Sequence, residues 1–272
     1  MQVQRHELVY MNWFKRQRVR YILRRHPIDF ELWEKVLQEN AVFKGLSSVD
    51  KAHLRELTTL LLHHKKFTGV QGLVLTVEMA VSVAALACLP ILKLGLVYYD
   101  GWTEIIIYPG IFRVKREQIN SDGLIVQQER MLSGEAWLRG PVILAWEEIK
   151  ADLLNPQAGH SVVIHELSHK LDMLNGSANG MPPLHMNMER QDWTRALSHA
   201  FESLTRDLSH HRRSHINAYA STSPAEFFAV VSEYFFIAPD KLQHHYPTVY
   251  EQLALFYHQN PAKRFAEMLA NE

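Results

Sequence analysis

Two histidines and a glutamate form an H-E-x-x-H pentad at His165, Glu166 and His169. On a helix, side chains four positions apart lie one above the other, about 5–6 Å apart at Cβ, so both imidazoles can bind one metal ion. The carboxylate of Glu166 then faces the remaining coordination position, where a water molecule would bind. Two nitrogen ligands, an open position and an adjacent general base are the parts that a zinc hydrolase needs. The pentad therefore predicts metal-assisted hydrolysis.

The residues around the pentad predict the helix that this chemistry requires. Ser161 can cap its start, and Asn175 with Gly176 can end it. His165, Glu166, His169 and Asp172 lie off a stripe of four apolar residues that recur at helical spacing and are expected to be buried: Ile164, Leu167, Leu171 and Leu174. Lys170 departs from the strictest metalloprotease pattern, which has an uncharged residue after the second histidine. The alternative is a pair of surface histidines near a glutamate, because a chain with 16 histidines can produce the pentad by chance.

Zinc needs a third protein ligand, and with Cys88 as the single cysteine the available types are His, Asp and Glu. The best candidate is Glu226, on a second predicted helix that begins with Ser223 as cap and Pro224 in the first position. The same spacing allows a capping box, in which Glu226 accepts a hydrogen bond from the backbone N–H of Ser223. Glu226 and Glu233 share an otherwise apolar face, and two carboxylates are costly to bury without a cation or metal. That cost favours a metal site, while the capping box stays open as the alternative.

Two segments carry a family resemblance: H-E-L-S-H-K-L-D at 165–172 and A-Y-A-S-T-S-P-A-E-F-F-A-V-V-S-E-Y-F-F at 218–236. The likeness continues upstream through 94–109 and 133–146 and covers about residues 42–261. In these segments the chain resembles the Mlc titration factor A family of glucose-regulated metallopeptidases, also called DgsA anti-repressors.

The resemblance implies a zincin fold similar to the catalytic domain of anthrax lethal factor, and a regulatory link to the repressor Mlc. It implies Glu166 as general base and Tyr219 as a donor to the transition state. The residues that it assigns to a single zinc ion are His165, His169 and Glu226. Asn217 departs from the family pattern, which has an acidic residue there, so no supporting acidic role is implied at that position. A core-packing role for Tyr219, with its hydroxyl satisfied locally, stays open beside the catalytic one.

The composition fits a soluble enzyme of the cytoplasm. The chain has 272 residues, 47% hydrophobic and 21% charged, enough for one large core. Lys plus Arg and Asp plus Glu are equal at 29 each, so the net charge does not indicate nucleic acid as a partner. One cysteine permits no internal disulfide, and the first residues lack the apolar run of a secretory signal. The apolar segment 79–92 is shorter than the about 20 residues that span a bilayer, so we expect a buried core helix and no membrane span.

The pattern along the chain predicts an α+β fold in two parts, and the resemblance implies that this fold is zincin-like. Residues 1–45 form a helical basic extension, whose run of cations is either a solvated face or a site for a phosphate-rich surface or partner. Residues 46–272 form the catalytic domain, with helices over 47–66 and 79–92. A small mixed sheet takes its strands from β-branched and aromatic runs: 95–99, 104–108 and 141–146.

Adjacent histidine pairs suggest a second metal site. Neighbouring side chains on a helix point about 100° apart, however, so they chelate one ion poorly. Structural or surface roles are therefore favoured for these histidines. The pairs are His63–His64, His210–His211 with His215, and His244–His245. The tryptophans are expected in the core or a cleft wall: Trp102, Trp137, Trp146 and Trp193.

The prediction for function is a zinc-dependent peptidase acting on a peptide or protein substrate, with aminopeptidase and endopeptidase action both open. The strand at 140–146 is expected to pair antiparallel with an extended substrate. The alternative is a non-catalytic interaction protein that sequesters the repressor Mlc and carries a structural zinc. A structural zinc site is closed by four protein ligands, whereas the sequence offers three good ones.

Overall fold

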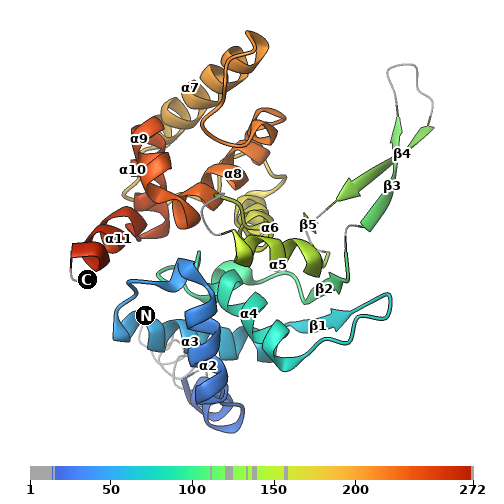
Figure 1. Ribbon diagram of the computed structural model, residues 1–272, viewed down its shortest axis with the longest axis vertical. Coiled ribbons are helices and arrows are strands. Elements are labelled where there is room, and N and C mark those ends of the chain that lie inside the picture. Colours follow the sequence, from blue (N-terminus) through green and yellow to red (C-terminus); the bar gives the residue numbers. More distant parts are fainter. Residues whose placement is uncertain are drawn as a thin grey trace, which may run out of the picture.

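A computed structural model describes residues 14, 16–110, 112–119, 125–132, 134–136, 140–155 and 159–270 of the chain (Figure 1). Residues 16–25 are helical, and ten further α-helices follow among the described residues: α2 (Phe30–Glu39), α3 (Ser48–His64), α4 (Val77–Cys88), α5 (Trp146–Leu154), α6 (Val162–Asp172), α7 (Arg190–Ser209), α8 (Pro224–Ile237), α9 (Pro239–His245), α10 (Pro247–Tyr257) and α11 (Pro261–Ala270). The short 3-10 helices are η1 (Ala41–Phe43), η2 (Leu96–Tyr99), η3 (Met173–Asn175) and η4 (Ala218–Ser221). The fold is α+β and mostly helical. No helix among the described residues combines the length and apolar character needed to cross a bilayer.

A small mixed sheet has the strand order β1 (Lys66–Gly69), β2 (Glu104–Tyr108), β6 (Val142–Ala145) and β5 (Gly134–Ala136). The first three strands are parallel, and β5 pairs antiparallel with β6. The strands predicted over 104–108 and 141–146 are confirmed as β2 and β6. A substrate cannot pair with 140–146 as expected, because β6 lies between β2 and β5 and both of its edges are hydrogen-bonded. Two further strands, β3 (Phe112–Ile119) and β4 (Ile125–Leu132), form an antiparallel pair.

The segment 95–99 is not the strand that its β-branched and aromatic residues predicted, but the 3-10 helix η2. Gly95 enters it with a φ of 87°, a left-handed conformation that favours glycine. Tyr99 is fully buried, its hydroxyl donates to the Ala87 carbonyl at 2.7 Å, and its own carbonyl accepts from Lys65 Nζ at 2.5 Å. These tertiary contacts with the residues of α4 and α3 replace strand pairing, so packing overrides local β propensity here.

The two helices predicted over 47–66 and 79–92 are present with nearby bounds. α3 begins after Ser47, whose hydroxyl accepts from the Asp50 N–H at 3.1 Å. α4 begins at Val77 after the Thr76 cap, earlier than residue 79, and ends at Cys88. Most of α4 is buried, as expected for a core helix.

Helix α6 packs against α8 and α4 in the centre of the molecule. Its predicted stripe is confirmed for Ile164, Leu167 and Leu171, which are completely buried, whereas Leu174 is 39% exposed. Leu174 lies in η3, after the regular helix has ended, so it no longer follows the buried face.

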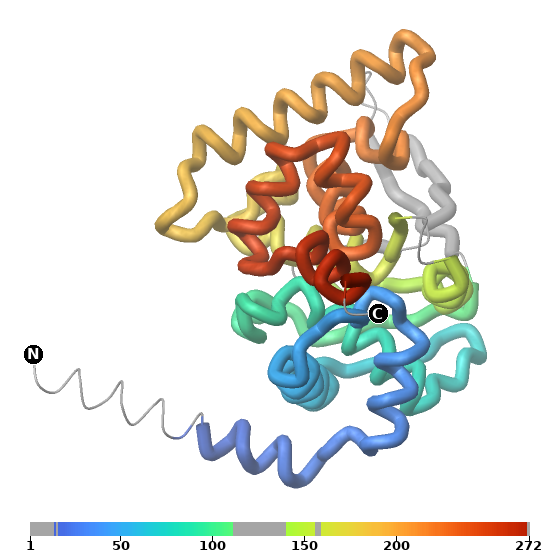
Figure 2. The backbone as a smooth tube through the Cα atoms, turned by 60° about the vertical axis from the view of Figure 1, so that its left-hand side comes forward, coloured from blue at the N-terminus to red at the C-terminus, as the bar shows by residue number. Residues whose placement is uncertain are grey.

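The C-terminal helix α11 lies beside the segment around η1, which joins distant parts of the sequence (Figure 2). The Arg264 guanidinium donates to the Val42 carbonyl at 2.8 Å. Trp33 and Val36 of α2 pack in the same hydrophobic core as Leu54 of α3. The predicted boundary between residues 45 and 46 stays a prediction.

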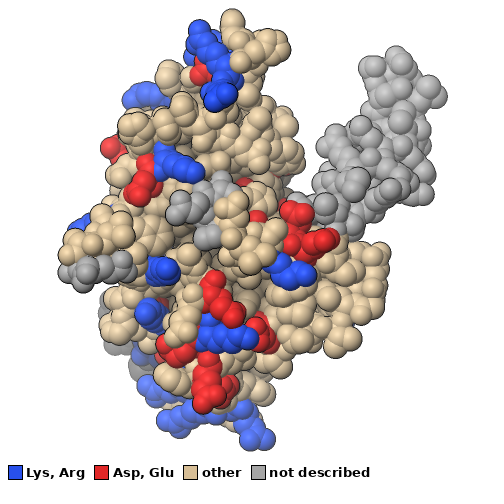
Figure 3. All heavy atoms as spheres, viewed as in Figure 1, with Lys and Arg blue, Asp and Glu red and all other residues tan. Residues whose placement is uncertain are grey.

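Basic and acidic side chains are interspersed on the face shown in Figure 3, and basic side chains gather at its lower end. Exposed arginines of the first helical segment include Arg16, Arg18, Arg20, Arg24 and Arg25. The helical form expected for this part of the chain is therefore present from residue 16 onward.

Candidate metal centre

The start of α6 is fixed by caps on its free backbone N–H groups. The Ser161 hydroxyl accepts from the Ile164 N–H at 3.4 Å, as the sequence predicted. A carboxylate oxygen of Asp152, at the end of α5, accepts from the Val162 N–H at 2.8 Å. η3 and Gly176 end the helical run, again as predicted. Local hydrogen bonds thus hold the turn that carries His165.

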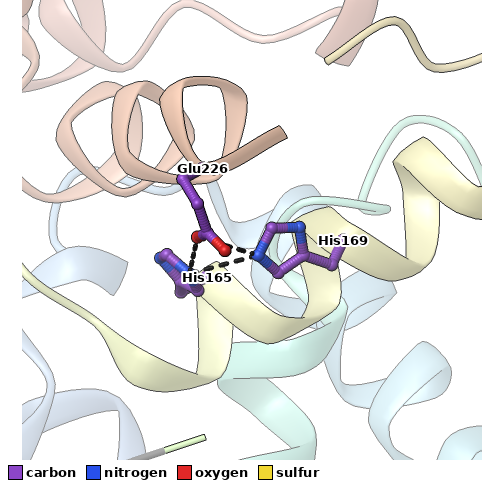
Figure 4. A group of neighbouring side chains, drawn as sticks. All are labelled: His165, His169 and Glu226. Carbon is purple, nitrogen blue, oxygen red and sulfur yellow. Dashed lines mark hydrogen bonds and ion pairs between the residues drawn. The ribbon is translucent and has the colours of Figure 1, made fainter. Parts of the chain in front are cut away.

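Glu226 lies on the first turn of α8 with its carboxylate against both pentad histidines (Figure 4). Its Oε2 is 3.0 Å from His165 Nε2 and 3.2 Å from His169 Nε2. The cap of α8 is supplied by the Ser223 hydroxyl, which accepts from the Glu226 N–H at 3.2 Å. The carboxylate itself is therefore directed to the histidines and does not close a capping box.

The three donor atoms have a spacing that suits one small metal ion. His165 Nε2 and His169 Nε2 are 3.2 Å apart, similar to their distances from Glu226 Oε2. In a tetrahedral zinc site with bonds of about 2.05 Å, neighbouring ligand atoms are about 3.3 Å apart. Among the described residues, these three form the only cluster of three or more His, Cys, Asp or Glu donors close enough to share an ion. The donor set fits a metal that accepts two nitrogens and one oxygen.

Electrostatics at the centre favour opposite charges on its histidine and carboxylate groups. Burial works to raise the pKa of Glu226, but hydrogen bonds with both histidines outweigh it and hold the pKa well below its ordinary value. Burial works to lower the pKa of His165, but the charge of Glu233 and hydrogen bonds to Glu226 and Glu233 raise it well above its ordinary value. The carboxylate is thus in the form that binds a metal, and a metal must displace a proton from His165.

Glu166 and Lys170 are both buried, at 5% and 3% exposure, so the pentad does not lie on a solvated surface. The Lys170 ammonium donates to the Gly140 carbonyl at 2.8 Å and lies 5.4 Å from the centre of the Trp102 ring. Burial lowers the pKa of Lys170 to about 8, and the nearby Glu166 carboxylate opposes this shift. The unusual cation after the second histidine is therefore a buried neighbour of Glu166, not a surface charge.

Tyr219 lies in η4 beside the centre and is 46% exposed, with its ring centroid 6.0 Å from that of His165. Asn217 caps η4, because its side-chain oxygen accepts from the Tyr219 N–H at 3.0 Å. A neutral amide at position 217 thus holds the turn that presents Tyr219. The exposure of Tyr219 argues against a simple core-packing role.

Three further residues connect to the centre: Glu233, His160 and Asp152. Glu233 Oε1 is 2.7 Å from His165 Nδ1, and its Oε2 accepts from the Ser161 N–H at 2.7 Å. His160 Nε2 is 3.7 Å from Glu233 Oε2, and its Nδ1 hydrogen-bonds Asp152. The sequence had singled out Glu233 by its cost of burial. His160 and Asp152 gave no such signal, because nothing in the local sequence shows that His160 lies near Glu233 of α8 or that Asp152 contacts His160.

Several of the histidines in the pairs singled out from the sequence make ring contacts. His215 and His245 stack with centroids 3.6 Å apart, and His244 lies edge-on to His245. His63 and His64 are also edge-on to each other. None of them belongs to a cluster of three donors within the described residues.

Comparison with known sequences places this centre in a family. Residues 11–258 match the sequence profile of the glucose-regulated metallo-peptidase M90 family. The chain is 37% identical over 222 residues to Mlc titration factor A of Yersinia pestis (strain Pestoides F), covering 80% of this chain and 81% of that protein. The Mlc titration factor A of Yersinia pseudotuberculosis serotype O:3 (strain YPIII) gives the same values. Because this match covers most of the chain, the protein belongs to the glucose-regulated metallo-peptidase M90 family.

Proposed function

We propose that this protein is a zinc-dependent peptidase with a zincin-like centre, in which His165, His169 and Glu226 hold the metal. The observation that carries the proposal is the convergence of three donor atoms at 3.0–3.2 Å, from the H-E-x-x-H helix and a second helix. Two imidazoles and one carboxylate are a common ligand set for catalytic zinc and leave a fourth position for water or substrate. Membership in a metallopeptidase family also supports a catalytic metal at this centre.

When bound, zinc supplies a Lewis acid that lowers the pKa of water toward about 7 and polarises the substrate carbonyl. Glu166 is the proposed general base: it takes a proton from the attacking water and passes it to the leaving amine. Its burial in α6 removes it from competing bulk water, and the Lys170 side chain is its buried neighbour. Tyr219 is the proposed donor to the carbonyl oxygen as negative charge develops there.

The substrate is proposed to bind as an extended strand along β5 rather than along β6. β5 is the last strand in the order of the sheet and lies beside α6, which carries the pentad. Main-chain hydrogen bonds to a sheet edge give affinity with little dependence on side chains, which suits a peptide or protein substrate.

A second role is proposed because the relatives carry the name Mlc titration factor A. That name points to the repressor Mlc, or an equivalent, as a protein partner. A purely sequestering protein with a structural zinc is less well supported, since a structural site needs four protein ligands and the described cluster has three. Both roles are compatible with a cytoplasmic protein in which a basic N-terminal extension of residues 1–45 precedes the catalytic domain.

The test compares wild type with Glu166→Gln for zinc content and for cleavage of generic peptidyl amides. The amide keeps the size of the side chain but cannot take the proton of water, so zinc stays at about one per chain while turnover falls about 10²–10⁴-fold. Glu251→Gln is the matched control, because Glu251 is an exposed glutamate on α10. Near-normal cleavage by Glu166→Gln would refute the proposed mechanism and favour the repressor-binding role.

A further inference from the structure

Glu233 is a buried carboxylate beside the candidate metal centre that is not itself one of the three donors. Only 2% of the residue is exposed. Both of its oxygens have partners on α6 or its cap, since Oε1 is 2.7 Å from His165 Nδ1 and Oε2 accepts from the Ser161 N–H at 2.7 Å. An ionised carboxylate only accepts hydrogen bonds, so Nδ1 of His165 must carry the hydrogen in this contact. The remaining nitrogen, Nε2, is the one that faces Glu226 and His169.

This contact fixes which nitrogen of His165 a metal receives. A neutral imidazole has one N–H and one free lone pair, and the hydrogen bond made by one nitrogen determines the role of the other. Metal-binding histidines commonly donate their second N–H to a carboxylate, which orients the ring and raises its basicity. His169 differs, because its Nδ1 is buried and has no hydrogen-bond partner among the described residues. A supporting carboxylate is therefore seen at one of the two histidine ligands.

His160 and Asp152 extend this contact away from the centre. His160 lies between two carboxylates, with Nδ1 hydrogen-bonded to Asp152 and Nε2 3.7 Å from Glu233 Oε2. The second oxygen of Asp152 accepts from the Val162 N–H at 2.8 Å. The three residues thus connect α5, the start of α6 and the middle of α8. A shift of any of these elements would move the carboxylate that holds His165.

We propose that Glu233 is a positioning residue for the metal centre, which holds the His165 ring with Nε2 toward the metal, and that His160 and Asp152 hold Glu233 in place. The inference rests on the proposed metal-binding function. The competing explanation is that Glu233 only caps the start of α6 through Ser161, in which case its loss would lower stability without changing metal affinity.

The variant Glu233→Gln separates these explanations. Glutamine offers one acceptor oxygen where both Glu233 oxygens now meet donors, so one of the two contacts must be lost. We expect zinc affinity, measured by competition with a chelating dye, to fall about 10- to 100-fold. Ser232→Ala is the matched control, because Ser232 is the adjacent, fully buried residue of α8 and binds the Tyr257 hydroxyl instead. It should lower stability and leave zinc affinity unchanged.

A double-variant cycle tests whether His160 acts through Glu233. His160→Gln should weaken zinc binding in the wild-type background and have no further effect once Glu233 is Gln, because His160 acts only through Glu233. Equal effects in both backgrounds would overturn this part of the proposal. Should Glu233→Gln not fold, Glu233→Asp takes its place, since it keeps the charge but shortens the reach to His165.

The outcomes separate this inference from the proposed function. If wild type binds no zinc, the proposed function fails and this inference fails with it. If wild type binds zinc, and Glu233→Gln and Glu233→Asp both bind it equally well, the positioning role alone is wrong and Glu233 is a helix cap. Unfolding of the metal-free variants, recorded in parallel, reports the capping contribution separately.

Discussion

Removal of Glu226 is the sharpest test of the metal centre, because this residue had two competing explanations. In the structure its N–H is capped by Ser223, while its carboxylate is 3.0 and 3.2 Å from the two histidine nitrogens. We expect Glu226→Ala to lose zinc, and Ser223→Ala to keep it. Loss of the cap in Ser223→Ala should cost about 1 kcal/mol of unfolding free energy, the usual value for an N-cap.

The expected effect of Glu226→Ala is best expressed through the unfolding free energy that the protein gains when zinc is added. With free zinc at about 1,000 times the dissociation constant, binding adds about 4 kcal/mol to the unfolding free energy. If loss of one of three ligands raises the dissociation constant about 1,000-fold, the same zinc concentration adds only about 0.4 kcal/mol. This difference between the zinc-dependent gains of wild type and Glu226→Ala does not depend on the hydrogen bonds that Glu226 makes in the metal-free protein. Loss of those hydrogen bonds costs about 1.5–3 kcal/mol by itself.

The assay is chemical unfolding of each variant with and without zinc, together with metal content by mass spectrometry. Wild type and Ser223→Ala should show the same large gain on adding zinc, and Glu226→Ala little gain. A Glu226→Ala protein that retains a full gain and full zinc content would refute the reasoning. Another ligand would then have to be sought.

Two further predictions concern the surroundings of the centre. Tyr219→Phe should lower kcat by about 10- to 1,000-fold with zinc content and KM little changed, as expected for loss of an oxyanion donor, whereas unchanged kcat would return Tyr219 to a structural role. For His160, the hydrogen bond to Asp152 and the charge of Glu233 outweigh the opposing effect of burial and raise the pKa to about 9. Because the folded pKa exceeds the unfolded value of about 6.5, the stabilisation is fully present below about pH 6.5 and is lost as the pH rises through about 9. The stability difference between metal-free wild type and His160→Gln should therefore shrink across this window, and a difference that grows with pH would contradict the assignment.

Local signals were enough for the parts of the site that lie within one or two helical turns. The four-residue spacing of His165 and His169, the Ser161 cap and the Ser223 cap all depend on contacts along the chain, and the structure has each of them. Such contacts can be predicted from the sequence because they join residues three or four positions apart and do not depend on the rest of the fold. The strand at 104–108 was predictable for a similar reason, since its run of β-branched and aromatic residues favours a strand locally.

Long-range packing decided the rest. Whether the Glu226 carboxylate turns back on its own helix or toward histidines on α6 depends on how α6 and α8 pack, across 57 and 61 residues of sequence. The contact of Glu233 with His165 spans 68 residues, and its contact with Ser161 spans 72. The segment 95–99 became a 3-10 helix because Tyr99 is buried against α4 and held by Lys65. The sequence by itself determined the spacing of His165 and His169, the position of Glu166 between them and the helix that carries all three, since these depend on local backbone geometry. Only the tertiary structure decided which carboxylates reach the histidines, because that depends on burying the apolar faces of helices far apart in the chain.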